Sequence, residues 1–148
     1  MKVGAIQSFF KSAWDSSCYA DCIIKLAAKI NRVELTLQEV GYAMDRGIDK
    51  GYIRFNQQDY SASDNFFVTN PAEFLGILTG KKYTVEKVRG DYVCKKGELE
   101  VDFMTLSKAN GEKNIGHFVL PDWDPIQNSN TKRNGFVWTK RIFREISR

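Results

Sequence analysis

Hydrophobic residues in the first part of the chain recur at every third or fourth position, which is the spacing of a helix that buries one face. From Cys18 to Ile30 the apolar residues follow this rhythm, and lysines occupy the other side. Asp15, Ser16 and Ser17, which come just before, are residue types that commonly cap helices. The pattern therefore predicts an amphipathic helix that begins after residue 17 and ends near Ile30.

Two further helices are predicted from the signals at their ends. Thr36 opens a capping box with the glutamate three residues later, and the helix that follows is expected to end near residues 46–47. Asn70, followed by a proline, begins another helix that ends at Gly80. Residues 48–68 are rich in Asn, Gln, Asp and Ser, with aromatic residues scattered among them, and are expected to be irregular.

The second half of the chain changes to a period of two, which is typical of strands with one buried face. Five strands are predicted, over residues 83–88, 99–104, 115–120, 135–138 and 141–146. Helices followed by strands indicate an α+β fold, in which N-terminal helices pack on a C-terminal antiparallel β-sheet. At this length we expect one domain, residues 1–148.

Composition and charge indicate a globular protein, but they do not identify its function. The chain is 43% hydrophobic and 13% aromatic, which favours a globular protein over a disordered one. The formal net charge is +4, and basic residues gather late in the chain, at 132–133, 140–141, 144 and 148. We interpret these basic residues as a solvated face, so no nucleic-acid partner is expected.

The cysteines and the hydropathy pattern indicate the compartment. The chain has three cysteines, no secretory signal and no apolar run long enough to cross a membrane. We therefore expect a cytoplasmic protein with reduced thiols and no membrane partner, while release by lysis or by export without a cleaved signal stays open. Cys22 is expected in the core, and Cys94 in a strand as a structural residue. A metal pair of Cys18 and Cys22 is only weakly indicated.

Cys18 is the candidate nucleophile. A thiolate attacks a carbonyl far better than a thiol does, and a helix N-terminus or a neighbouring imidazolium favours the thiolate. Cys18 falls in the opening turn of the first predicted helix, where its backbone N–H could also bind a developing oxyanion. The alternative is that Cys18 is an ordinary small core residue.

His117 is the chain's one histidine, so it is the candidate general base. It shares a strand face with Val119, and a tight turn at residues 121–122 would bring Asp124 onto that face, diagonal to His117. Asp124 would then hold one imidazole nitrogen and fix its tautomer. Asp122, within the turn, is the weaker candidate. A structural role for His117 and turn chemistry for the aspartates remain open.

Several short motifs occur in an order that suggests a family. A carboxamide that could donate to an oxyanion precedes the cysteine, and the histidine motif is followed by an Asp-Pro pair. The motifs are Gln7, Cys18-Tyr19, the capping box at Thr36, Gly116-His117-Phe118-Val119 and Asp124-Pro125. With them the chain resembles the papain superfamily of cysteine peptidases, and within it the compact group similar to bacteriocin-processing peptidases. Residues 129–135 and 141–144 resemble the closing hairpin of that group.

The resemblance implies a papain-like fold and a thiol peptidase or amidase, a hydrolase. Cys18 would be the nucleophile, His117 the base, Asp124 the orienting carboxylate, and Gln7 an oxyanion donor. The substrate would be a peptide, a protein or another amide, cleaved by a monomer through a thioester, with no cofactor and no metal. Acyl transfer and deamidation by the same residues stay open. The alternative is a catalytically inactive binding module on this fold, which would hold a protein or nucleic-acid partner.

Overall fold

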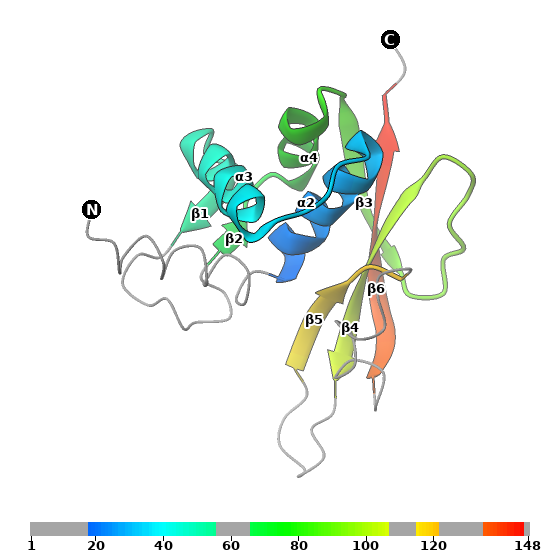
Figure 1. Cartoon of the computed structure of the whole chain (residues 1–148). Helices are drawn as coiled ribbons and strands as arrows, with labels where there is room; N and C mark the ends of the chain where they lie inside the picture. The colour runs from blue at the N-terminus through cyan, green and yellow to red at the C-terminus, as the bar shows by residue number, and fades with distance from the viewer. Residues whose placement is uncertain (1–17, 56–65, 107–114, 122–134, 147–148) are drawn as a thin grey trace. The chain divides into compact units, whose positions relative to one another are not determined.

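The structure is a computed structural model that describes residues 18–55, 66–106, 115–121 and 135–146. The chain forms two compact units, residues 1–83 and residues 84–148, and each unit is described by itself. The first unit contains the described helices and a short strand pair, and the second contains a larger sheet (Figure 1). The predicted α+β class, with helices before an antiparallel sheet, is confirmed.

Three helices occur in the described part of the first unit, and the caps of two of them explain where these begin. They are α2 (Cys18–Asn31), α3 (Leu37–Asp49) and α4 (Pro71–Thr79). Thr36 accepts a hydrogen bond from the backbone N–H of Glu39, as the capping box predicts. Asn70 caps α4 in the same way, and Gly80 ends it in the left-handed conformation. All three predicted helices are therefore confirmed.

One helix extends further than predicted. The expected stop at residues 46–47 was wrong, because Gly47 remains inside α3, which ends at Asp49. The glycine is needed for close packing, since a Cβ at position 47 would lie 2.6 Å from Cδ1 of Ile53. Gly47 therefore lets the chain beyond α3 pack against the helix, rather than ending the helix.

The buried faces of the three helices form the core of the first unit. Seven of the fourteen residues of α2 are buried: Ala20, Cys22, Ile23, Ile24, Leu26, Ala27 and Ala28. Met44 of α3 and Phe74 and Leu75 of α4 are fully buried. The Asn31 side chain donates to the carbonyl of Leu78 at 2.9 Å, which ties the end of α2 to the last turn of α4. The apolar residues that recur at helical spacing in the sequence are thus the ones that pack in the core.

Residues 48–68 were expected to be irregular, but part of this segment forms strands. They contain β1 (Ile53–Phe55) and β2 (Phe66–Val68), which pair antiparallel with Ile53 opposite Val68. Each strand has only three residues, so polar residues dominate the composition of the segment 48–68, and its composition did not indicate the strands. Both Ile53 and Val68 are buried, and their burial stabilises this pair against the helices of the unit.

The second unit contains a four-stranded sheet with the order β3-β6-β4-β5. The strands are β3 (Tyr83–Arg89), β4 (Leu99–Leu106), β5 (Ile115–Val119) and β6 (Gly135–Glu145). Strand β4 pairs antiparallel with both β6 and β5, so it is an inner strand. Its residues Val101 and Asp102 are buried, which places part of the unit's core along β4.

Residues 135–138 and 141–146 form a single strand, not the two strands that were predicted. The polar pair Thr139-Lys140 suggested a break, but both residues pair with β4 inside the ladder. The irregularity is a bulge one residue earlier. Phe103 lies opposite Thr139 and Met104 lies opposite Val137, so Trp138 is an extra residue on β6.

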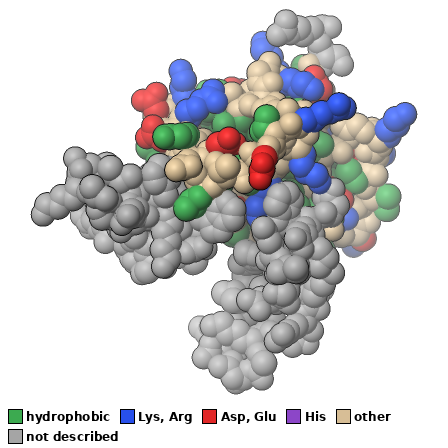
Figure 2. Space-filling model, in the orientation of Figure 1, with side chains coloured by type: hydrophobic (Ala, Val, Ile, Leu, Met, Phe, Trp, Pro, Cys, Tyr) green, Lys and Arg blue, Asp and Glu red, His purple; other side chains and the backbone are tan. Residues whose placement is uncertain are grey.

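The surface carries both signs of charge. On the face drawn in Figure 2, basic, acidic and hydrophobic side chains are intermixed over the described residues. Among the helices that the structure describes, none has the length and apolar character needed to cross a membrane.

Candidate functional site

Cys18 is the first residue of α2, which agrees with its predicted place in the opening turn. Its side chain is partly exposed, and it carries a thiol, not a disulfide. The first N–H groups of a helix have no carbonyl partner within the helix, and they carry the positive end of its dipole. A thiolate or an oxyanion at this position is therefore favoured by the local backbone.

The other two thiols differ from Cys18. Cys22 lies one turn further along α2 and is 4% exposed, so the expectation of a core residue is confirmed. Cys94 lies in the connection between β3 and β4 and not in a strand, so that prediction was wrong. Its thiol lies 3.5 Å from the carbonyl oxygen of Glu98. Burial, and then the charges of Glu100 and Glu98, raise the pKa of the Cys94 thiol.

His117 lies in β5, where its backbone is opposite Met104 of β4. The predicted strand is therefore confirmed. Cys18 belongs to the first unit and His117 to the second. A contact between the side chains of Cys18 and His117 stays a prediction. Gln7, Asp122 and Asp124 lie outside the described residues.

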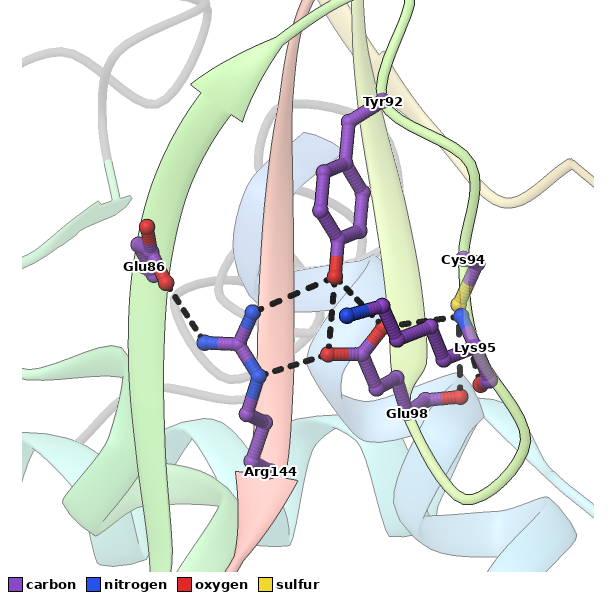
Figure 3. Close-up of polar contacts among 6 residues, drawn as sticks. All are labelled: Glu86, Tyr92, Cys94, Lys95, Glu98 and Arg144. Carbon is purple, nitrogen blue, oxygen red and sulfur yellow. Dashed lines mark hydrogen bonds and ion pairs between the residues drawn. The ribbon is translucent and has the colours of Figure 1, made fainter.

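The structure reveals a polar cluster in the second unit that sequence reasoning did not identify (Figure 3). Arg144 of β6 is at its centre. The guanidinium donates to Glu86 of β3 and to Glu98, at 2.6 Å in each case, and it lies 3.4 Å from the hydroxyl oxygen of Tyr92. One side chain thus links two strands to the connection between β3 and β4.

Glu98 is the most heavily bonded carboxylate of this cluster. The backbone N–H of Lys95 donates to it at 2.8 Å, and the Tyr92 hydroxyl donates at 2.8 Å. The Lys95 N–H, and then Arg144 and Tyr92, lower the pKa of Glu98 to about 2. Glu98 therefore stays ionised at neutral pH and holds the connection in place as an acceptor.

Next to this cluster, β4 carries two carboxyl groups that share a strand face, Glu100 and Asp102. The ammonium of Lys140 lies 3.4 Å from Glu100 and donates to the carbonyl of Tyr92 at 2.8 Å. Asp102 is 6% exposed, and its Oδ1 atom has no hydrogen-bond partner. Burial, and then a hydrogen bond with Glu100, raise the pKa of Asp102 to about 8. Burial thus favours the protonated form of Asp102 at neutral pH.

These groups could have been found only in part from the sequence. The alternation of apolar and acidic residues in β4 puts Glu100 and Asp102 on one face, but this pattern of a half-buried strand did not indicate that Asp102 is buried. Lys140, the partner of Glu100, lies forty residues away, and Arg144 lies 46 residues from Glu98, so no local pattern indicates which strands these residues join. Within the described residues, no group of three or more His, Cys, Asp or Glu side chains is arranged to hold a metal ion.

The fold and these residues define an α+β protein with a cysteine at the start of a helix and a histidine within an antiparallel sheet. The chain belongs to a family whose model matches residues 5–145 and is described as DUF261, protein of unknown function. No curated protein matches the chain. No solved structure matches it either.

Proposed function

We propose that the protein is a papain-like cysteine peptidase or amidase with Cys18 as its nucleophile. The observation that carries the proposal is the contrast along α2. Cys18 begins the helix and is partly exposed, whereas Cys22, one turn later, is buried. A nucleophile must be reachable by a substrate and must be stabilised as a thiolate, and the start of a helix provides for both.

The order of the elements also supports the proposal. Helices come first and an antiparallel sheet second, and the candidate base His117 lies within that sheet. This order agrees with the papain-like resemblance of the sequence. Cys18 and His117 come from the two different units, so the proposed active site requires these units to bring the residues together.

The chemistry needs only side chains and water. His117 takes the proton of the Cys18 thiol, and the sulfur attacks the carbonyl carbon of an amide. The Cys18 backbone N–H and Gln7 hold the oxyanion while the C–N bond breaks, and His117 gives its proton to the leaving amine. Water then attacks the thioester, which releases the acid and restores the thiol. Asp124 orients the imidazole throughout.

The test is the alkylation rate of each thiol by iodoacetamide against pH, read by mass spectrometry in the full chain. At pH 6.5 we expect Cys18 to react at least about tenfold faster than Cys94, because only a thiolate reacts quickly. Cys22 and Cys94 serve as internal controls, since one is buried and burial raises the pKa of the other. His117→Ala should remove the fast reaction of Cys18.

Two results would contradict the proposal. One is a Cys18 thiol as slow as Cys94 at every pH. The other is a fast Cys18 thiol that His117→Ala leaves unchanged, since the imidazole would then play no part. In either case the alternative, a binding module without catalysis, becomes the better account.

A further inference from the structure

Three aromatic rings form a row across neighbouring strands of the second unit. Trp138 of β6 lies 6.3 Å from Phe103 of β4, and Phe103 lies 4.8 Å from Phe118 of β5, measured between ring centroids. The rings are tilted by 37° and 54°. Residues from three strands thus place their aromatic rings side by side on one face of the sheet.

A cation lies at the Phe118 end of this row. The guanidinium carbon of Arg141 is 5.4 Å from the centroid of the Phe118 ring. The same guanidinium donates to the hydroxyl of Thr139 at 2.9 Å, which fixes its position on β6. This guanidinium therefore places a positive charge over the partly exposed Phe118 ring, at one end of the row.

Trp138, at the other end of the row, lies at the bulge of β6. As the extra residue of β6 it is 61% exposed, although it lies in the middle of a strand. Gly90 approaches this bulge closely, because its N–H donates to the carbonyl of Trp138 at 3.0 Å. A Cβ at position 90 would lie only 2.2 Å from the carbonyl oxygen of Val137, so this approach requires glycine.

An open hollow of about 610 Å³ lies beside Trp138 and is lined by the end of β3 and the bulge of β6. It includes two exposed basic residues, Lys87 and Arg89, and one acidic residue, Asp91. The ion pair of Arg89 and Asp91 spans 3.4 Å between highly exposed side chains, so it restrains neither group strongly. The hollow therefore adds net positive charge at the Trp138 end of the row.

We propose that this sheet face binds single-stranded nucleic acid. The exposed Trp138 ring can stack on a base, the partly exposed Phe103 and Phe118 continue the row, and basic groups at both ends can meet the phosphates. The ring spacings of 4.8 and 6.3 Å exceed the rise of about 3.4 Å per nucleotide in a duplex strand, so they suit an extended single strand. Charge complementarity favours this ligand over an apolar peptide. The proposal does not depend on the Cys18 chemistry.

From the sequence, a nucleic-acid partner was only the alternative for an inactive binding module, and this surface was not expected. Phe103, Phe118 and Trp138 lie fifteen or more positions apart, and only strand pairing brings them together. The basic residues that drew attention in the sequence were those of the C-terminal region. Of these, Arg141 is the one that the structure places over the aromatic row.

The test is fluorescence anisotropy of a labelled twelve-nucleotide oligo(dT) titrated with the full chain at 50 and 200 mM salt. Trp138→Ala should weaken binding about 5- to 100-fold, the range found for the loss of one stacked base. Lys87→Gln with Arg89→Gln should reduce the slope of log affinity against log salt by about 1.4. Trp138→Phe keeps an aromatic ring and should stay within about threefold of the natural chain.

Matched controls separate the surface from a general effect. Tyr42→Ala removes an aromatic residue of similar exposure, 62%, from α3, and should leave binding unchanged. Lys96→Gln removes an exposed charge from the connection between β3 and β4, and should leave the salt slope unchanged. Far-ultraviolet circular dichroism establishes that each variant is folded, and Trp138→Phe carries the test if Trp138→Ala does not fold.

The proposal is overturned if the natural chain does not bind the oligonucleotide at 50 mM salt. It is also overturned if folded Trp138→Ala binds as well as the natural chain, or if Trp138→Phe loses binding although it is folded. Equal affinity for a duplex of the same sequence would refute the single-strand specificity. These outcomes leave the alkylation test of Cys18 untouched, because that test uses no nucleic acid.

Discussion

The buried carboxyl group of Asp102 provides a sharp test of the structure through the variant Asp102→Asn. Asparagine has nearly the same shape, cannot ionise, and still offers an N–H to Glu100. Because burial and the hydrogen bond with Glu100 raise the pKa of Asp102 from 3.8 to about 8, the folded protein binds a proton that the unfolded chain releases between these two values. The variant removes this difference.

The sign and size of the effect follow from proton linkage. Where the folded state binds more protons than the unfolded state, the free energy of unfolding falls as the pH rises. The contribution of Asp102 is thus fully present below pH 4 and is lost by about pH 8. A tenfold change in proton affinity corresponds to about 1.4 kcal/mol, so the full loss would be roughly 6 kcal/mol. The folded protein can relax and admit water around the ionised group, which reduces such burial costs, so we expect about half of this loss.

The assay is urea unfolding followed by circular dichroism at pH 4, 5, 6, 7 and 8. Natural protein and Asp102→Asn should be nearly equal in stability at pH 4, and the variant should be more stable by about 2–3 kcal/mol at pH 8. Asp91→Asn is the matched control, because Asp91 lies in the same unit with a highly exposed side chain, and its effect should stay within about 0.5 kcal/mol. A variant that is less stable than the natural protein at pH 8 would refute the reasoning, as would a difference that does not change with pH.

Three substitutions test the packing by the same unfolding measurement at one pH. Gly90→Ala should destabilise by about 1–3 kcal/mol, because its Cβ would meet the carbonyl oxygen of Val137, and an unchanged stability would contradict the close approach. Thr36→Ala should cost about 1 kcal/mol through loss of the cap on α3, whereas Thr36→Asp should restore it. Phe74→Ala should cost about 3–5 kcal/mol, since this ring is completely buried, and a cost below 1 kcal/mol would place it outside the core.

Local signals predicted much of the fold. The cap residues Thr36 and Asn70 correctly gave the starts of two helices, because each satisfies backbone N–H groups within its own first turn. The alternation around Val101 correctly predicted β4, because side chains two positions apart on a strand share a face. Such features depend on neighbouring residues alone, and the sequence contains them.

Features that depend on distant partners were missed. The close approach of Ile53 to Gly47 inside α3 and the continuity of β6 along β4 both depend on such partners. The polar cluster of Arg144 and the row of rings at Trp138 also join residues from separate strands. For the candidate site, the sequence correctly placed Cys18 at a helix start and the strand of His117, and the interaction between these two residues stays a prediction.

The two proposals make different demands on the molecule, and this difference allows them to be separated. The proposed catalysis would require a residue from each unit, so a change that keeps Cys18 and His117 apart should slow the reaction of Cys18 even when both units remain folded. The proposed nucleic-acid face lies entirely within the second unit, so the same change should leave oligonucleotide affinity intact. If a variant loses Cys18 reactivity and still binds the oligonucleotide, its defect therefore concerns the approach of Cys18 and His117, not the sheet. Joint loss of both properties in a folded protein would instead indicate that the sheet itself is altered.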